Sequence, residues 1–319
     1  NAAYWRRDRP YLDRIVFKIV PDESSRVIAF ERGEIDVLNY LGFPFSELDR
    51  LSKLPNVKAV FDANALGVVM VVPMNLRGPI LSRVEVRQAM AYAINREEIL
   101  QRAMFGLGKV AISPIPTDVR WAHNPKVKQY AHDPAAANRL LDKAGLPRGA
   151  DGVRFKLSIY LDGGRLAHRK TAELMREHLR AVGIDLEIRP TEVGSLVDTV
   201  WKAWNFDLAL FEPATGPDPA IGMSRLYTTE FIQKLPSTNA MGYSNPQVDR
   251  LFVEAASVSD RKKLAELYGR IQDILVEDVP ALPLVEPPYP TLFRTEFVGF
   301  PVGPFKNERL ENVWWTKGK

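Results

Sequence analysis

The fold is decided by the stretch that opens with Val153–Leu161 (VRFKLSIYL) and closes with Phe206–Phe211 (FDLALF). Apolar and polar residues alternate in the first of these segments, as in a half-buried strand, and Ile184–Arg189 predicts a further strand between the two. Apolar residues recur at helical spacing over Leu166–Val182, and Val193–Trp204 predicts a second helix. The order β-α-β-α-β indicates parallel strands that are joined by right-handed crossovers.

The loop after the third strand, Glu212–Pro219 (EPATGPDP), leaves the carboxyl end of that strand. In open α/β sheets, ligands bind at this edge, outside the carboxyl ends of the strands. We therefore expect this loop to carry part of a binding site.

Strand and helix patterns also occur near the beginning of the sequence. Leu12–Val20 (LDRIVFKIV) alternates and predicts a strand, Ser24–Arg32 predicts a short helix, and Ile35–Leu38 predicts a second strand. Gly67–Pro73 (GVVMVVP) is entirely apolar, which is typical of a strand that is buried on both faces. A second β-α-β unit is therefore expected ahead of the one around Val153–Phe211.

The composition excludes several kinds of protein. The 319 residues are 46% hydrophobic, which is enough core for two lobes, and they contain no cysteine, so disulfides and thiolate chemistry are excluded. The 43 basic and 39 acidic residues are scattered along the chain, a pattern typical of a solvated surface and not of a nucleic-acid interface. Apolar runs have strand length, none approaches a membrane span, and no leader pattern is present in these residues.

Four blocks of sequence, in this order, carry a family resemblance. The chain resembles the extracytoplasmic solute-binding proteins of family 5, the peptide, nickel and oligosaccharide receptors of ABC importers, over essentially its whole length. The blocks are Tyr4-Trp5 with Pro10–Val37, Val84–Ile99 (VEVRQAMAYAINREEI), His132–Gly145 (HDPAAANRLLDKAG) and Gly242–Leu251 (GYSNPQVDRL) with the helix that follows it.

The resemblance implies an α/β fold of the periplasmic-binding-protein type II class, with two lobes of mixed sheets flanked by helices. Such receptors close around a ligand by a hinge motion. Residues 1–72 and 287–319 would belong to lobe one and residues 73–286 to a complete second lobe, with hinges near 71–75 and 284–287. Lobe one would be incomplete, because family members carry further strands and an export signal ahead of the Tyr-Trp block.

The resemblance also implies a mode of action. We expect a periplasmic monomer without cofactor or metal, which captures a small-molecule or peptide solute and delivers it to the permease subunits of an ABC transporter. Oligopeptide, modified peptide, opine-like compound, sugar and metal chelate all fit the sequence. The same fold also serves as the ligand-sensing domain of some cytoplasmic transcription regulators, which is the alternative function.

The loop Glu212–Pro219 departs from the pattern of peptide-binding members. Those members carry a tryptophan there and then an aspartate that pairs with the amino terminus of the peptide, whereas Pro213 and Gly216 fall near the two positions here. A buried ammonium without a carboxylate is costly, so this contact with an ordinary peptide is not expected. Glu212 or Asp218 could replace the aspartate, although an aspartate before proline is typical of a turn.

Further candidates come from the same resemblance. Arg165 lies near the place where some members hold a ligand carboxylate, and the alternative is an arginine on a surface loop. Met70 matches a contact position in the hinge strand but also fits a core residue. The expected ligand-binding residues are Asn39, Tyr40, Met70, Arg165, Phe211, Glu212, Thr215, Asp218 and Glu286.

Nothing in the sequence favours an enzyme. The four histidines, His123, His132, His168 and His178, show no spacing of paired metal ligands. No nucleophile elbow, phosphate-binding loop or dinucleotide fingerprint occurs. We therefore expect a binding protein without catalytic residues.

Overall fold

The computed structural model describes residues 4–39, 42–62, 67–216, 218–300 and 310–316. By their internal contacts the residues form two units. Unit one consists of Asn1–Leu66 and Pro288–Lys319, and unit two of Gly67–Pro287.

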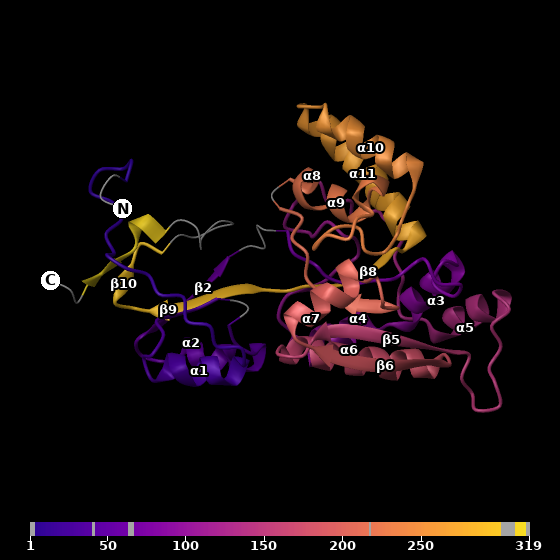
Figure 1. Cartoon of the computed structure of the whole chain (residues 1–319), viewed down its shortest axis with the longest axis horizontal. Coiled ribbons are helices and arrows are strands. Elements are labelled where there is room, and N and C mark those ends of the chain that lie inside the picture. Colours follow the sequence, from indigo (N-terminus) through magenta and orange to yellow (C-terminus); the bar gives the residue numbers. More distant parts are fainter. Residues whose placement is uncertain (1–3, 40–41, 63–66, 217, 301–309, 317–319) are drawn as a thin grey trace. The chain divides into compact units, whose positions relative to one another are not determined.

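Unit two contains the predicted parallel sheet (Figure 1). Strand β5 pairs in parallel with β6 on one side and with β7 on the other, so the predicted parallel order is confirmed. The π-helix that continues α7 ends the second crossover before β7. The elements are β5 (Phe155–Asp162), α6 (Leu166–Ala181), β6 (Ile184–Thr191), α7 (Val193–Val197), the π-helix (Asp198–Lys202) and β7 (Leu208–Leu210).

A second sheet of unit two is antiparallel, with β8 between β3 and β4. All residues of β3 and β8 are buried, as the apolar run in the sequence predicted. Bridges from Val71 to Phe211 and from Met74 to Leu208 link β3 to the edge of the parallel sheet. The strands are β3 (Met70–Pro73), β4 (Lys109–Val110) and β8 (Ala281–Glu286).

Helices that begin at polar caps surround these sheets. Asn95, Asp133 and Asn245 each accept a hydrogen bond from a backbone N–H in the first turn of the helix that follows. No helix of the described residues is both long enough and apolar enough to cross a membrane. The helices are α3 (Val84–Ala93), α4 (Arg96–Arg102), α5 (Pro134–Lys143), α8 (Pro219–Gly222), α9 (Ser224–Tyr227), α10 (Pro246–Ala256) and α11 (Arg261–Asp278), with a 3₁₀ turn at Thr229–Phe231.

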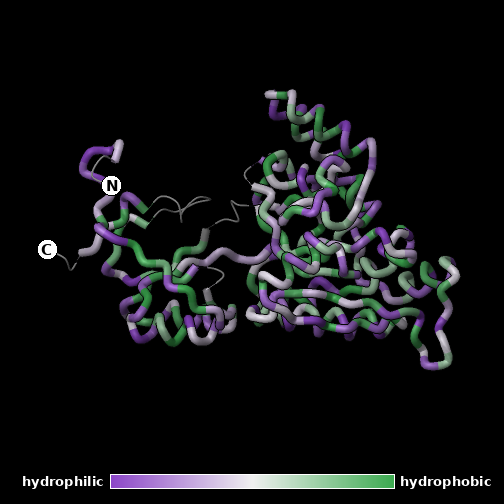
Figure 2. Tube along the Cα trace, viewed as in Figure 1, coloured by the Kyte–Doolittle hydropathy of each residue, from purple (hydrophilic) through white to green (hydrophobic). Residues whose placement is uncertain are grey.

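Unit one is built on an antiparallel sheet in which β9 lies between β1 and β2. Helices α1 and α2 lie on one side of this sheet (Figure 1). Figure 2 shows hydrophobic residues, in green, along both the strands and the helices of this unit. A separate pair, β10 and β11, follows. The elements are α1 (Glu23–Glu31), β1 (Val37–Leu38), α2 (Leu48–Ser52), β2 (Val57–Asp62), β9 (Tyr289–Arg294), β10 (Phe297–Val298) and β11 (Trp314–Trp315), with 3₁₀ turns at Phe45–Glu47 and Leu310–Asn312.

The strand predicted over Leu12–Val20 is not formed. The segment lies in the described part of unit one but pairs with none of the strands described there. Alternation predicts which face of a segment is apolar, whereas a strand also needs a neighbour to receive its backbone hydrogen bonds. The prediction was wrong because none of the described strands pairs with this segment.

Candidate functional site

The carboxyl ends of β5 and β7 bring two segments of unit two together. Leu161 and Leu210 are paired across the sheet, so the residues that follow each of them leave the same edge. Arg165 is the N-cap of α6, after β5, and Glu212 comes two residues after β7 ends. The topology therefore places a basic and an acidic side chain at the edge that the sequence predicted as the binding edge.

These two side chains form a buried ion pair. Nη1 of Arg165 donates a hydrogen bond of 2.7 Å to Oε2 of Glu212, and the two side chains are 10% and 5% exposed. Nη1 of Arg165 also lies 3.1 Å from Nε2 of His168, which is one turn further along α6. Nε2 of His168 is 3.5 Å from the other carboxylate oxygen of Glu212. We call Arg165, His168 and Glu212 the edge cluster.

The edge cluster keeps Glu212 charged. Burial by itself raises the pKa of this carboxyl, but the guanidinium of Arg165 and the ring of His168 outweigh the burial, so the pKa is lowered from its ordinary value of 4.5. Glu212 is therefore an anion at neutral pH and Arg165 balances its charge. Any ligand at this edge meets a neutral pair and not a lone carboxylate.

Two polar atoms of the edge cluster retain hydrogen-bonding capacity. Nδ1 of His168 and Oε1 of Glu212 are buried and have no hydrogen-bond partner among the described residues. Buried polar atoms are rarely left unsatisfied, and functional sites are one place where they persist. A hydroxyl or amide group can donate to the carboxylate oxygen, which makes the cluster suited to a neutral polar group.

The sequence named two members of the edge cluster but not their relationship. It predicted Arg165 as the partner of a ligand carboxylate and Glu212 as the partner of a ligand ammonium, and the structure pairs the two with each other. His168 was missed. Its spacing of three residues from Arg165 places both on one face of a helix, which is the signal that was available.

Asp218 and Thr215 shape the loop after β7. The carboxylate of Asp218 caps α8 by accepting from the N–H of Ala220 at 2.9 Å, and it accepts from the hydroxyl of Tyr268 at 3.0 Å. Thr215 is buried, and its hydroxyl donates to the carbonyl oxygen of Gly67 at 2.8 Å. Both side chains are thus engaged within unit two, and their contact with a ligand stays a prediction.

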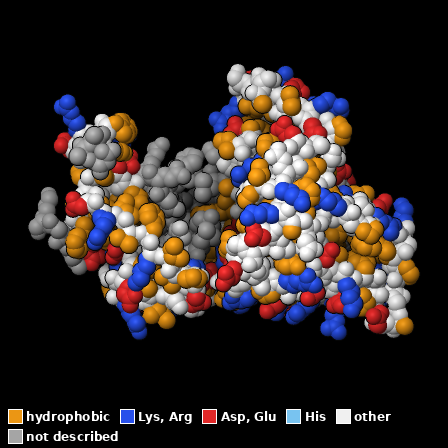
Figure 3. Space-filling view, in the orientation of Figure 1, with side chains coloured by type: hydrophobic (Ala, Val, Ile, Leu, Met, Phe, Trp, Pro, Cys, Tyr) orange, Lys and Arg blue, Asp and Glu red, His pale blue; other side chains and the backbone are white. Residues whose placement is uncertain are grey.

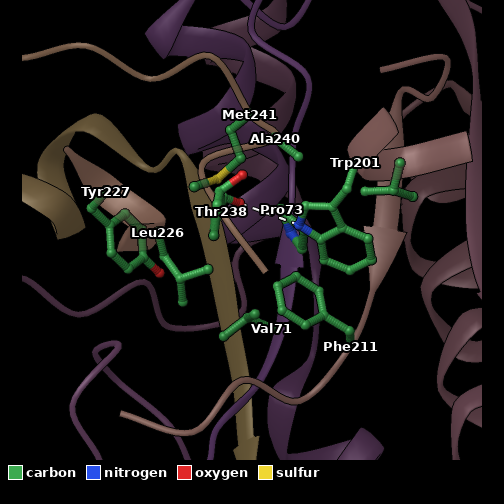
Figure 4. A pocket seen from close by; sticks show the side chains of 11 residues that line it. Val71, Pro73, Trp201, Phe211, Leu226, Tyr227, Thr238, Ala240 and Met241 are labelled. Carbon is green, nitrogen blue, oxygen red and sulfur yellow. Dashed lines mark hydrogen bonds between the residues drawn. The ribbon is translucent and has the colours of Figure 1, made fainter. Parts of the chain in front are cut away.

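Phe211 packs edge-on against Trp201, with 5.2 Å between the ring centroids. Figure 4 shows both rings beside a small apolar pocket, in which the indole N–H of Trp201 donates to the carbonyl oxygen of Thr238 at 3.2 Å. The cavity volume open to the centre of a water molecule is about 10 Å³. The pocket therefore has room for one water molecule at most. The pocket is therefore a packing void, and it is too small for a solute.

A wider groove lies over the amino-terminal halves of β5 and β6. It measures about 660 Å³ and its lining includes Lys156, Asp185, Glu187 and Arg189. Lys156 pairs with Asp185 at 3.7 Å and Arg189 with Glu187 at 2.8 Å. These four charges are thus paired with each other, the lining also contains Arg176 and Asp207, and the groove lies away from the edge cluster at the carboxyl ends of β5 and β7.

Met70 and Glu286 are buried on the antiparallel sheet. Met70 is fully buried in β3, where the hydroxyl of Thr171 approaches its sulfur at 3.7 Å. Glu286, at the end of β8, accepts hydrogen bonds from the N–H of Thr117 at 3.0 Å and from its hydroxyl at 2.7 Å. Burial raises the pKa of Glu286, and the bonds from Thr117 oppose the shift only in part.

The two remaining candidates belong to unit one. Asn39 follows β1, is half-buried, and its carbonyl oxygen accepts from the N–H of Gly42 at 2.7 Å. Tyr40 lies outside the described residues. Within the described part of the chain, no group of three His, Cys, Asp or Glu side chains is placed to hold a metal ion.

The family follows from comparison with known proteins. The model of the bacterial extracellular solute-binding proteins, family 5 Middle, matches residues 1–233. The chain belongs to this family. The fold class and the resemblance predicted from the sequence are thereby confirmed, and the relatives are solute-binding proteins and not transcription regulators.

Solved structures and curated proteins agree. The periplasmic binding protein DppA from Helicobacter pylori, solved with the peptide STSA, is 26% identical with a TM-score of 0.88 over 99% of this chain and 59% of that one. A dipeptide-binding protein from Pseudoalteromonas is 25% identical with a TM-score of 0.87 over 99% of this chain and 60% of that one. The oligopeptide-binding protein AppA of Bacillus subtilis is 26% identical over 96% of this chain.

The matches cover only part of each relative. The chain spans 56% of the Bacillus subtilis protein and 57% of a dipeptide-binding protein from Pseudomonas aeruginosa. More than two fifths of each of these relatives therefore has no counterpart among the 319 residues.

Proposed function

We propose that this chain is part of the extracytoplasmic binding component of an ABC importer, which captures a small peptide-like solute and delivers it to the permease. Family membership supports this proposal, as do the names of relatives that bind oligopeptides, dipeptides and glutathione. The division into lobes at residues 72/73 and 286/287, and the hinge near them, remain part of the proposal. The contacts divide the chain close by, at 66/67 and 287/288.

The edge cluster carries the proposal about the kind of solute. Glu212 is the first acidic residue after β7 in the sequence, and its charge is already matched by Arg165 at 2.7 Å. A ligand ammonium at Oε1 of Glu212 would meet a carboxylate whose charge Arg165 already balances, so it would add an uncompensated buried charge, whereas a hydroxyl or amide donor adds none. The proposed solute is therefore peptide-like but presents no free ammonium at this edge.

Calorimetry on the complete protein tests this proposal with trialanine and N-acetyl-trialanine. We expect the acetylated peptide to bind as tightly as the free peptide or within about tenfold, which corresponds to about 1.4 kcal/mol. Glu212→Gln is expected to alter both affinities alike. A free peptide that binds about 100-fold tighter and loses this advantage in Glu212→Gln would contradict the proposal. Binding of neither peptide would exclude trialanine-like peptides as the solute and would leave this proposal without support.

A further inference from the structure

The edge cluster differs in its burial from the charged groups at the surface of unit two. Figure 3 shows Lys, Arg, Asp and Glu side chains interspersed over the face of unit two that is drawn there, where water and salt screen them. The side chains of Arg165, His168 and Glu212 are only 10%, 4% and 5% exposed. In such a dry environment hydrogen bonds are strong, and a polar atom without a partner is costly.

The contacts of His168 determine which of its ring nitrogens carries the proton. Nη1 of Arg165, which can only donate, lies 3.1 Å from Nε2 of His168. Oε1 of Glu212 lies 3.5 Å from Nε2 but has no hydrogen-bond partner among the described residues, so Nε2 does not donate to it. Nε2 therefore accepts the hydrogen bond from Arg165, and the proton of the neutral ring is on Nδ1.

Charge balance favours the neutral ring at pH 7. The charges of Arg165 and Glu212 already cancel, so a second cation on His168 would be buried without a counterion. A protonated ring would also direct Nε2–H at the guanidinium that now donates to this nitrogen. The positive charge with which His168 helps to lower the pKa of Glu212 belongs to the acid range in which that carboxyl titrates.

The edge cluster thus presents one donor and one acceptor that the described residues leave unused. Nδ1–H of His168 is buried without an acceptor, and Oε1 of Glu212 is buried without a donor. A ligand carboxylate has no proton to donate to Oε1, and an ammonium cannot accept from Nδ1–H. A carboxamide has both functions and no charge, because its carbonyl oxygen accepts and its N–H donates.

We propose that the edge cluster binds a carboxamide group of the solute. Nδ1–H of His168 donates to the carbonyl oxygen of this group, and Oε1 of Glu212 accepts from its N–H. Arg165 is a positioning residue, because its hydrogen bond to Nε2 keeps the proton of His168 on Nδ1. The inference rests on the proposed function, since a peptide-like solute carries carboxamide groups.

Nuclear magnetic resonance measures the tautomer on the complete protein, labelled with ¹⁵N-histidine and freed of carried solute. The nitrogen chemical shifts distinguish protonated from unprotonated ring nitrogens, and the signals that vanish in His168→Gln identify this ring. We expect the proton of His168 on Nδ1 at pH 7. A proton on Nε2, or on both nitrogens, would overturn the inference whether or not a peptide binds.

Small probe molecules test the chemical class without a peptide. Acetamide should shift the Nδ1 signal of His168 at a concentration at least about tenfold lower than N,N-dimethylacetamide, which has the carbonyl oxygen but no N–H for Oε1 of Glu212. Acetate and methylammonium should leave the signal unchanged over the same range. Equal responses to the two amides, or a response to either ion, would overturn the inference.

Matched substitutions in the complete protein give a calorimetric measurement with N-acetyl-trialanine. His168→Gln can keep an acceptor for Arg165 but has no donor at the position of Nδ1, so the Kd should rise at least about tenfold. His168→Asn places an amide N–H near that position and should recover most of the affinity. His178→Gln is the control, with an expected change of less than about threefold, since His178 is also buried on α6 with Nε2 2.9 Å from Oε2 of Glu98.

The outcomes separate this inference from the proposed function. An unchanged Kd in His168→Gln, or an equal loss in His168→Gln and His168→Asn, would overturn the inference and leave the proposed function intact. If N-acetyl-trialanine does not bind while acetamide still shifts the signal of His168 selectively, the proposed function fails and the carboxamide site remains.

Discussion

The guanidinium of Arg165 lies 2.7 Å from the carboxylate of Glu212, and both side chains are almost fully buried at the carboxyl edge of a parallel sheet. The two residues are 47 positions apart in the sequence and come from the ends of neighbouring strands, β5 and β7. The opposite charges of the pair cancel each other. Oε1 of Glu212 has no hydrogen-bond partner among the described residues, so it can accept a hydrogen bond from a neutral group of a ligand.

Removal of one member of this pair should destabilise unit two strongly. Arg165→Met leaves the carboxylate of Glu212 buried without its cation, and we expect a loss of about 3–5 kcal/mol in the free energy of unfolding. Urea denaturation measures the loss. Arg189→Met serves as the control, since the Arg189–Glu187 pair has a similar length of 2.8 Å but is 44% and 65% exposed, and its effect should be much smaller.

The double variant Arg165→Met/Glu212→Leu should recover most of that loss. It removes both charges at once and fills the site with apolar side chains, so no buried charge is left alone. If the double variant is less stable than Arg165→Met, the cost does not come from an unpaired carboxylate, and our account of the pair is wrong.

Acid should weaken the protein through Glu212. The pKa of this carboxyl is raised by burial and lowered more by Arg165 and His168, so it lies below its ordinary value of 4.5 in the folded state. The pair thus contributes stability above pH 4.5, and the contribution is lost as the pH falls from there through the lowered pKa. Urea denaturation between pH 2 and 7 should show a steeper decline for the unmodified protein than for Arg165→Met/Glu212→Leu. Equal slopes would contradict this prediction.

Glu286 should have the opposite dependence on pH. Burial raises the pKa of Glu286 above its ordinary value of 4.5, so the folded protein binds a proton here more tightly than the unfolded chain does. The stability that this difference contributes is complete below pH 4.5 and is lost as the pH rises through the raised pKa. Glu286→Gln is neutral at every pH and keeps one acceptor for Thr117. The stability of this variant relative to the unmodified protein should therefore increase from pH 4 to 7, and a constant or falling difference would refute the assignment.

Gly67 should be sensitive to the addition of a single methyl group. Its φ of +63° is unfavourable for other residues, and a Cβ there would lie 2.0 Å from Oγ1 of Thr215. Gly67→Ala is expected to lower the free energy of unfolding by more than about 1 kcal/mol. Gly78→Ala is the control, because its Cβ meets nothing within 4 Å, and thermal unfolding of both variants should separate them. Equal melting temperatures would contradict the prediction.

Local patterns were sufficient to predict the parallel sheet. The alternation in Val153–Leu161 and the helical spacing over Leu166–Val182 arise from neighbours in sequence, and they agree with β5 and α6. The pairing of Arg165 with Glu212 could not be predicted in the same way, because it depends on which strands are neighbours in the sheet. A sequence pattern can identify charged side chains as candidate ligand-binding residues. Whether such side chains contact a ligand or each other depends on the topology of the sheet.

Leu12–Val20 illustrates a second limit. Its alternating pattern is as clear as that of β5, yet it forms no strand among the described residues. The pattern records which face is apolar and carries no information about the neighbour that completes the sheet. The same limit applies to Asn39. The resemblance at its position in the sequence predicted a ligand contact, but the sequence does not show which groups lie opposite this side chain.

The mass and chemistry of the solute that the complete protein carries test the central claim most directly. Native mass spectrometry should show a bound peptide-like compound of small mass, and this compound, once released, should resist Edman degradation because it has no free amino terminus. A ladder of masses spaced by amino-acid residues, readable by Edman chemistry, would mean that free peptides bind at this edge despite the Arg165–Glu212 pair, and it would contradict our account.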